Sequence, residues 1–300
     1  MRIVINTPNG KIGRNLALRL LDAGVALTVI SRNAQNVADL AKRGATVVEG
    51  SSDDAAVLDR AFEGASALFW LTPPAARPDF LEWAEGMGRL AARKAKQHGV
   101  KRVVVLSSIG AQTGRGTGPV GALLAVEEAF KAAVPDVTIL RPGYFMENLL
   151  REVQGLASAG SIFLPLPSDR KLPFVATADI GDKAAEVLLD GAWKGHRYVG
   201  VHGPRDVTYA EVAGVLSEVL GKPVRFVQVT MADARKAMAG AGVPGFMTDL
   251  ILELYQSVTE GRMDPAEPRS TETTTPTTLA QWAKDNLVPA LTRAGDEARR

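Results

Sequence analysis

Two glycines near the start of the chain have a spacing that suits phosphate binding. Gly10 and Gly13 lie where a short apolar run, residues 3–5, is followed by a segment with helical spacing that begins at about Lys11. Glycine lets the backbone turn sharply there, so that a diphosphate can approach the N–H groups at the helix N-terminus. The usual first glycine of such a turn is Thr7 in this chain. The pattern predicts a phosphate-binding turn, and an ordinary strand-to-helix turn is the alternative.

A basic residue at the end of the second apolar run indicates which nucleotide is bound. In nucleotide-binding α/β folds the residue at this strand end faces the adenosine ribose, and an acid there binds the 2′-hydroxyl of NAD. Here Ser31 is followed by Arg32, whose planar guanidinium suits a 2′-phosphate. The sequence therefore favours NADP(H) as the cofactor. A solvated surface arginine is the alternative.

The elements that must hold these residues alternate regularly along the first half of the chain. Apolar, β-branched runs at residues 3–5, 27–30, 45–48, 67–71, 103–106 and 137–140 are separated by segments of helical spacing. In the first of these segments Ile12, Leu16 and Leu20 share one face, and Gly24 provides a left-handed end. Strands joined by helical crossovers predict an α/β fold with a Rossmann-type, doubly wound parallel sheet.

The regular alternation of predicted strands and helices ends after Leu150. Residues 155–169 are rich in Gly, Ser and Pro, residues 208–221 have helical spacing, and residues 264–278 form a loop before a last amphipathic helix. We expect residues 1–150 to form the NADP-binding domain. Residues 151–300 are expected to form a smaller substrate-binding lobe over the carboxyl ends of the sheet, with some parts free to return to the sheet.

The amino-acid composition limits the kinds of molecule that the protein is expected to bind. The 300 residues are 46% apolar, and 35 Lys and Arg against 33 Asp and Glu give a formal charge of +2, so we expect no nucleic-acid partner. The chain has no cysteine, and His98, His196 and His202 lack metal-ligand spacing, so no metal site is expected. Short apolar runs predict no membrane span and a cytoplasmic protein. We leave open whether the chain forms a homodimer.

Three further segments carry a family resemblance. They are residues 71–74 (Leu-Thr-Pro-Pro), 105–111 (Val-Leu-Ser-Ser-Ile-Gly-Ala) and 138–148 (Thr-Ile-Leu-Arg-Pro-Gly-Tyr-Phe-Met-Glu-Asn). With the glycine turn and shorter matches in the second half, they resemble the NmrA-like family of atypical short-chain dehydrogenases. The segment at 138–148 is the most distinctive.

The resemblance implies a set of cofactor-binding residues. Those expected to wrap the pyrophosphate are Thr7, Pro8, Asn9, Gly10, Lys11 and Ile12. Those expected along the adenosine and ribose path are Thr72, Pro73 and Pro74, and those near the nicotinamide are Pro142, Gly143, Tyr144 and Phe145. Ser107, after the fifth strand, is a further candidate. Thr7, and Ser51 where an acid often lies near the adenine, depart from the family pattern and are expected to weaken or alter cofactor binding.

The acid–base pair that many short-chain dehydrogenases use is missing. In those enzymes a Tyr-x-x-x-Lys pair exchanges a proton with the substrate oxygen. The matching positions are Pro119 and Leu123, and no tyrosine of the chain has a lysine four residues later. Without the pair, the rate of hydride transfer would depend on how the cofactor and the acceptor are positioned. A conjugated acceptor delocalises the negative charge that it gains, so it needs little proton donation from the protein.

Three residues are candidates for supporting the chemistry. Tyr144 and Ser108 are expected to donate hydrogen bonds to the substrate, and Glu127 is a candidate acid–base residue. The structural alternatives are that Tyr144 packs against the cofactor, Ser108 satisfies backbone groups, and Glu127 is a solvated helix residue. The leading hypothesis is an NADPH-dependent reductase of a conjugated, quinone-like or aromatic small molecule. A non-enzymatic NADP(H)-sensing regulatory protein and a non-redox enzyme on the same fold are the alternatives.

Overall fold

A parallel sheet forms the centre of the molecule. The structure is a computed structural model and describes residues 1–298. Seven strands lie in the order β10-β6-β5-β4-β1-β2-β3, and every neighbouring pair is parallel. Their bounds are β1 (Arg2–Asn6), β2 (Ala26–Ser31), β3 (Thr46–Glu49), β4 (Ala67–Leu71), β5 (Arg102–Leu106), β6 (Asp136–Pro142) and β10 (His196–Val201). The predicted Rossmann-type sheet is confirmed.

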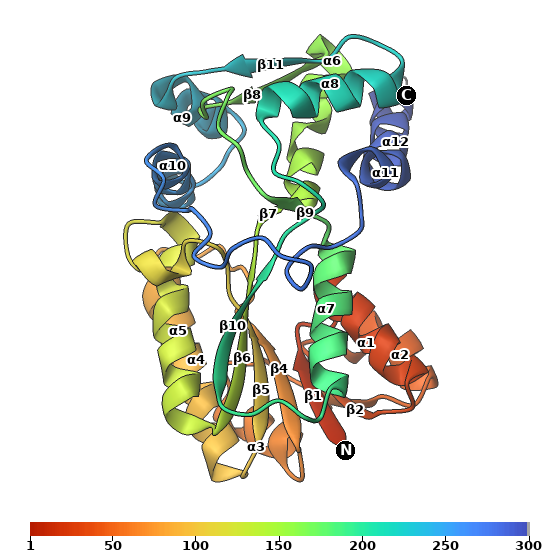
Figure 1. Cartoon of the computed structure of the whole chain (residues 1–300), viewed down its shortest axis with the longest axis vertical. Helices are drawn as coiled ribbons and strands as arrows, with labels where there is room; N and C mark the ends of the chain where they lie inside the picture. Colours follow the sequence, from red (N-terminus) through yellow and green to blue (C-terminus); the bar gives the residue numbers. More distant parts are fainter. Residues whose placement is uncertain (299–300) are drawn as a thin grey trace.

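Helices cover both faces of this sheet (Figure 1). One face carries α1 (Lys11–Asp22), η1 (Ala34–Val37), α2 (Ala38–Lys42) and α7 (Thr177–Leu189), and the other carries α3 (Ala55–Phe62), α4 (Phe80–Gln97) and α5 (Leu123–Ala133). Alternate residues of β5 enter the two cores: Val104 packs on the α1 side and Val105 on the α5 side. Burial on both faces explains why the central strands are continuously apolar.

The seventh strand, β10, comes from the second half of the sequence, parts of which were expected to return to the sheet, but it was not predicted as a strand. It pairs with β6 at the sheet edge, where Tyr198 lies opposite Ile139. Only the second half of β10 is buried, so its sequence, His-Arg-Tyr-Val-Gly-Val, lacks the apolar run of a central strand. The preceding helix, α7, packs on α1, where Arg19 pairs with Asp182 at 2.7 Å.

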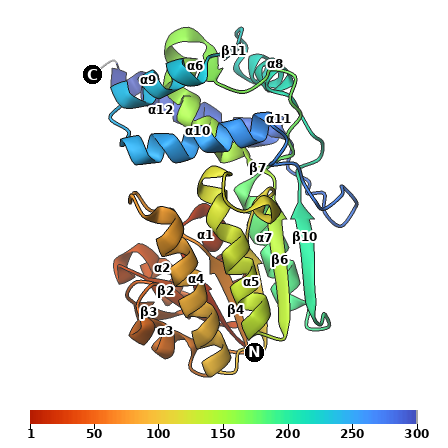
Figure 2. The ribbon, with the colours of Figure 1, turned by 90° about the vertical axis from the view of Figure 1, so that its left-hand side faces the viewer.

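The remaining elements form a lobe over the carboxyl ends of the strands (Figures 1 and 2). Its helices are α6 (Val153–Ala159), α8 (Tyr209–Leu220), α9 (Met231–Gly240), α10 (Gly245–Thr259), α11 (Leu279–Trp282), η5 (Ala283–Leu287) and α12 (Val288–Ala298). Its strands β8 (Ser161–Leu164) and β11 (Arg225–Gln228) pair with each other, as do β7 (Tyr144–Phe145) and β9 (Phe174–Val175). Leu156, Ile162 and Leu216 belong to a separate core of this lobe.

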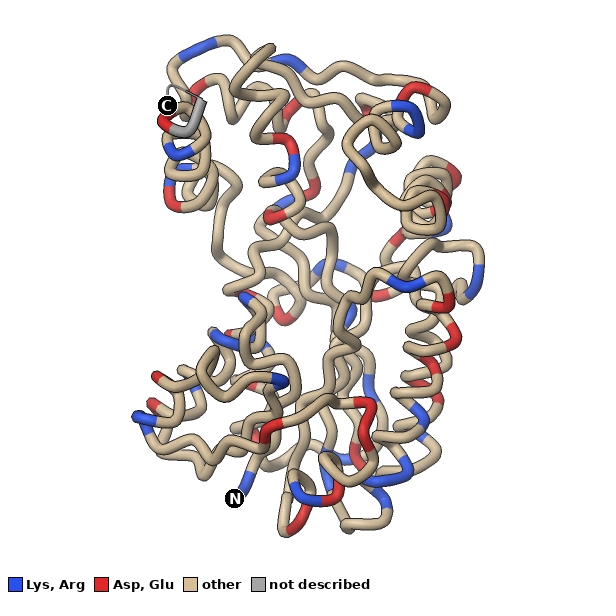
Figure 3. The backbone as a smooth tube through the Cα atoms, turned by 180° about the vertical axis from the view of Figure 1, so that it is seen from behind, with Lys and Arg blue, Asp and Glu red and all other residues tan. Residues whose placement is uncertain are grey.

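Short helical turns join the lobe to the sheet. They are η2 (Ala111–Thr113), η3 (Gly118–Ala122) and η4 (Met146–Glu152). Within residues 1–298 no helix is long and apolar enough to cross a membrane. Lys, Arg, Asp and Glu are interspersed along the tube in Figure 3, which fits the near balance of charge.

Candidate functional site

The turn between β1 and α1 has the features of an anion-binding site. α1 begins at Lys11, as predicted, and its first hydrogen bond runs from the N–H of Arg14 to the carbonyl of Gly10 at 2.8 Å. Gly10 offers no side-chain cap, and the first turn holds no acidic residue. The positive end of the helix dipole is therefore uncompensated by the protein and suits a phosphate group.

The two glycines of this turn are needed for different reasons. A Cβ on Gly13 would lie 2.3 Å from the carbonyl oxygen of Thr7, so only glycine fits where the helix packs against the turn. Gly10 has an ordinary extended backbone, and a Cβ there would lie 3.6 Å from that same oxygen. Gly10 is thus not required by the protein's own packing, and its bare Cα leaves space beside the helix N-terminus.

Thr7 adopts a backbone conformation that favours glycine. Its φ is +57°, in the left-handed region that a β-branched residue rarely occupies. Its hydroxyl is buried, and within the described part of the chain it has no hydrogen-bond partner. The departure noted in the sequence therefore places a strained residue with a buried, unpartnered hydroxyl in the turn.

Next to this turn, β1 and β4 separate at the switch point of the sheet. Their pairing ends at Ile5 and Phe69, and the side chain of Asn6 then spans the gap to Leu71. Asn6 Nδ2 donates to the Leu71 carbonyl at 2.7 Å, and the Leu71 N–H donates to Asn6 Oδ1 at 2.9 Å. Open α/β sheets bind ligands in the crevice at this point. Asn6 was missed from the sequence, although a polar residue ending an apolar strand was the available signal.

The end of β2 lies beside the same turn. Asn9 Nδ2 donates to Ser31 Oγ at 3.5 Å, and Ser31 Oγ donates to the carbonyl of Asn33 at 2.8 Å. Arg32 is exposed and makes no hydrogen bond or ion pair within residues 1–298, whereas nearby Arg14 pairs with Asp39 at 2.7 Å. The predicted residues Asn9, Ser31 and Arg32 are thus brought together, with the guanidinium of Arg32 available to an anion.

The loop after β4 faces the crevice from the other side. Thr72 and Pro73 are half-buried and Pro74 is exposed. The Thr72 hydroxyl is buried and, among the described residues, has no hydrogen-bond partner. An unsatisfied hydroxyl costs stability unless a ligand or water completes it, so its place beside the crevice fits a binding role.

At the end of β5 the polar residues are instead tied to one another. Ser107 Oγ donates to Oε1 of Glu127, which is fully buried on α5. Arg141 Nε and Nη2 donate to the two oxygens of Glu127 at 3.0 and 2.7 Å. Arg141 Nη1 donates to Oε1 of Glu267 at 2.9 Å. This buried network (Ser107, Glu127, Arg141 and Glu267) joins two strands, a helix and the loop at residues 264–278.

The network changes the interpretation of Glu127. It is not the solvated helix residue of the alternative, because its side chain is 0% exposed. Both of its oxygens already accept hydrogen bonds from Ser107 and Arg141, which favours a structural role over proton exchange with a substrate. Arg141 and Glu267 were missed because the network depends on contacts between distant positions. Arg141 lies 14 positions from Glu127 and 126 positions from Glu267 in the sequence.

Ser108 and Tyr144 lie on the segments that follow β5 and β6. Ser108 is half-buried directly after the network residue Ser107. The ring of Tyr144 lies 5.2 Å from that of Phe174 and 6.3 Å from that of Tyr209. Burial raises the pKa of the Tyr144 phenol, so it is protonated at neutral pH and able to donate a hydrogen bond. Pro119 and Leu123 lie on η3 and α5 and supply no acid or base.

The segment after β6 is shaped by packing. A Cβ on Gly143 would lie 1.9 Å from the carbonyl oxygen of Pro173, and the Tyr144 N–H donates to that oxygen at 3.0 Å. Pro142 and Gly143 are buried, while Phe145 is half-buried against the α1-side core. The protein's own contacts therefore explain Gly143, and the segment holds Tyr144 above the strand ends.

Glu147 links the lobe to α7 and was not predicted to have a role. It accepts hydrogen bonds from Thr177 Oγ1 at 2.6 Å and from Trp282 Nε1 at 3.1 Å. Asp179 likewise accepts a hydrogen bond from Thr277 Oγ1 at 2.6 Å. These contacts hold the C-terminal loop and α11 over the sheet.

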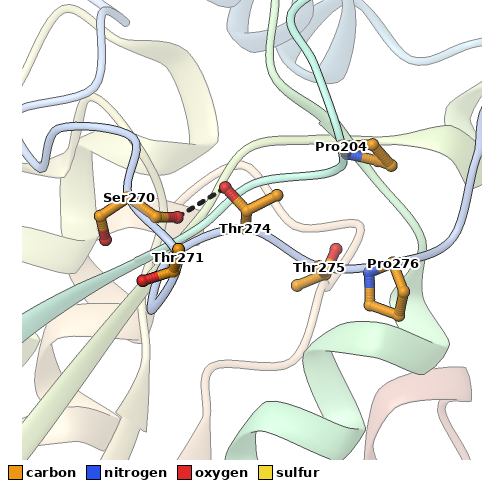
Figure 4. Close-up of a pocket in the computed structure, with 6 residues that line it drawn as sticks. All are labelled: Pro204, Ser270, Thr271, Thr274, Thr275 and Pro276. Atoms are coloured by element: carbon orange, nitrogen blue, oxygen red, sulfur yellow. Dashed lines mark hydrogen bonds between the residues drawn. The ribbon is translucent and has the colours of Figure 1, made fainter.

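A pocket of about 550 Å³ lies on the C-terminal loop (Figure 4). Its lining residues are Pro204, Ser270, Thr271, Thr274, Thr275 and Pro276. Thr274 Oγ1 donates to the Ser270 carbonyl at 2.7 Å beside it. None of the site residues predicted from the sequence lines this pocket, so we do not assign it to the nucleotide.

The sheet order and the glycine turn at its switch point define the Rossmann class of nucleotide-binding fold. Within that class, the chain belongs to the NmrA-like family, whose pattern matches residues 1–283. It is 31% identical over 259 residues to the NAD(P)H azoreductase of Xenophilus azovorans, covering 84% of this chain and 86% of that protein.

Solved structures share the whole architecture. The triphenylmethane reductase of Citrobacter sp., complexed with NADP(H), has a TM-score of 0.81 at 22% identity and covers 95% of this chain and 99% of its own. An NADPH-dependent quinone oxidoreductase from Escherichia coli, complexed with NADPH, has a TM-score of 0.82 at 23% identity with the same coverage. At these identities the likeness establishes the fold.

Proposed function

We propose that this protein is an NADPH-dependent reductase that transfers hydride to a conjugated, quinone-like or aromatic small molecule. The observation that carries the proposal is the pairing of an uncapped α1 N-terminus with an exposed, unpaired Arg32 among the described residues. These groups suit the diphosphate and the 2′-phosphate of NADP(H) respectively. The similarity to an NAD(P)H azoreductase at 31% identity supports the same class of reaction.

The residues of the crevice fit the cofactor. The α1 N-terminus beside Gly10 would hold the diphosphate, Arg32 the 2′-phosphate, and Thr72 an oxygen of the adenosine half, which would complete its unpartnered hydroxyl. When bound, the nicotinamide supplies the hydride. Thr7, Asn9 and Ser31 shape the path between these points.

The reaction end of the site works by positioning. The buried network fixes Ser107, and therefore the start of the loop that carries Ser108. Ser108 and the protonated Tyr144 donate hydrogen bonds that orient the acceptor. A conjugated acceptor spreads the negative charge that it gains with the hydride, so a proton from water completes the reaction without a side-chain acid. This explains how the chain can lack the Tyr-x-x-x-Lys pair.

The test is oxidation of NADPH and NADH by the purified protein with azo dyes, quinones and triphenylmethane dyes as acceptors. We expect NADPH to be consumed in step with at least one class of acceptor, and NADH to be used less efficiently. Tight NADPH binding without turnover on any acceptor would reject the reductase and favour an NADP(H)-sensing protein. Conversion of an acceptor without NADPH consumption would favour a non-redox enzyme.

A further inference from the structure

Thr7 combines two unfavourable features at the centre of the nucleotide turn. A β-branched side chain is held at a φ of +57°, where glycine would be unstrained. Its hydroxyl is buried and, within residues 1–298, has no hydrogen-bond partner. Each feature costs folding stability. The turn therefore carries a cost that a glycine at this position would avoid.

The rest of the turn prevents Thr7 from escaping this conformation. Its carbonyl oxygen accepts a hydrogen bond from the Gly10 N–H at 3.2 Å. The same oxygen lies against Gly13, where a Cβ would come within 2.3 Å of it. The peptide orientation is thus fixed by both glycines, and only the side chain of Thr7 can turn about its Cα–Cβ bond.

We infer that the Thr7 hydroxyl donates a hydrogen bond to an oxygen of the bound dinucleotide, and so increases affinity at the expense of the cofactor-free protein. The inference rests on the proposed function. The hydroxyl belongs to the turn between β1 and α1, at the switch point of the sheet and beside the α1 N-terminus. Binding supplies the partner that the protein does not, so the cost of the orphaned hydroxyl is present only in the cofactor-free state.

Three substitutions separate the hydroxyl from the strained backbone. Thr7→Val keeps the shape and the branching but removes the hydroxyl, Thr7→Ser keeps the hydroxyl, and Thr7→Gly removes both the side chain and the strain. Thr117→Val is the matched control, because Thr117 is fully buried and its hydroxyl already donates to the Gly114 carbonyl at 2.7 Å. Calorimetry would give the NADPH Kd and the melting temperature of each cofactor-free protein.

The expected pattern is weaker binding without loss of folding. Thr7→Val raises the NADPH Kd about tenfold, the effect of one hydrogen bond to a charged acceptor, with a melting temperature no lower than that of the wild type. Thr7→Ser keeps the Kd within about threefold. Thr7→Gly raises the Kd as Thr7→Val does and raises the melting temperature by about 2 °C. Thr117→Val lowers the melting temperature and leaves the Kd unchanged.

Titration with 2′,5′-ADP, which lacks the diphosphate bridge, locates the partner oxygen. Because 2′,5′-ADP keeps the 5′-phosphate, a tenfold effect of Thr7→Val on both ligands places the oxygen on the adenosine half, that phosphate included. An effect on NADPH alone places it on the second phosphate or beyond. Unchanged NADPH affinity in Thr7→Val would overturn the inference while leaving the proposed function intact. A wild-type protein that binds no NADPH would overturn both.

Discussion

The carboxyl edge of the sheet has two halves that treat their polar groups in opposite ways. Around β1, β2 and β4, Thr7, Arg32 and Thr72 lack protein partners within the described residues. Around β5 and β6, Ser107, Glu127 and Arg141 are joined in one buried network. Unsatisfied buried polar groups are costly, so the hydroxyls of Thr7 and Thr72 fit a site that a ligand completes.

The two halves of this edge therefore have different roles in the protein. The nucleotide half keeps its binding groups available to a ligand, whereas the other half uses the buried acid–base candidate Glu127 to hold its own structure. Hydride transfer in such a site depends on where the two reactants are held. The predictions below test each side of this contrast.

The largest effect is expected from breaking the buried network. Arg141→Ala leaves the fully buried Glu127 without its counter-ion and should lower the free energy of unfolding by about 3 to 5 kcal/mol, measured by urea denaturation. Arg205→Ala is the control, because Arg205 and Glu211 form an exposed pair, and its loss should be below about 1 kcal/mol. Equal losses in the two variants would contradict a structural role for the network.

On the nucleotide side, Arg32→Ala should weaken NADPH binding by about thirtyfold, because a charge-assisted contact to the 2′-phosphate is lost. NADH, which lacks that phosphate, should bind with little change. Lys42→Ala removes an exposed charge from the end of α2 and serves as the control. Equal weakening of NADPH and NADH would show that Arg32 does not read the 2′-phosphate.

A smaller effect is expected at the reaction end. Ser108→Ala and Tyr144→Phe should each lower kcat by about tenfold or less, the value of one orienting hydrogen bond. A true general acid would contribute about a hundredfold or more. Steady-state rates with an azo dye measure the difference. A thousandfold loss in either variant would mean that this half does contain an acid–base catalyst.

The smallest effect concerns pH. Burial lowers the pKa of His202 from its ordinary value of 6.5, so the folded protein holds this imidazole neutral while the unfolded chain protonates it. Below pH 6.5 the unfolded state therefore binds more protons, and stability falls as the pH decreases, by at most about 1.4 kcal/mol per pH unit. Unfolding curves between pH 7 and 5 should show a steeper decline for the wild type than for His202→Gln. Parallel declines would exclude His202 as the cause.

Local patterns predicted six strands of the sheet but not β10, the strand at one edge. The five inner strands, β1, β2, β4, β5 and β6, are largely buried and read as apolar runs. Helix starts and stops such as Lys11 and Gly24, whose φ is +72°, follow from the residue types within a few positions. β10 was missed because it begins with the polar residues His196 and Arg197 and exposes Tyr198, which is 39% exposed. Its place beside β6 depends on the crossover through α7 rather than on its own sequence.

The candidate site divides in the same way. The positions of Gly13 and Arg32 follow from their spacing relative to strand ends, which the sequence shows directly. The roles of Glu127, Arg141 and Glu267 depend on three elements meeting in space. No spacing rule reveals such a meeting, and a helix glutamate looks solvated until its partners are known.

Titration calorimetry of the wild-type protein with NADPH and NADH tests the central claim most directly. The account predicts one NADPH bound per chain, at least about tenfold more tightly than NADH, because the 2′-phosphate adds a charged contact at Arg32. The account would be contradicted if neither coenzyme gave binding heat and neither competed with the other for the protein.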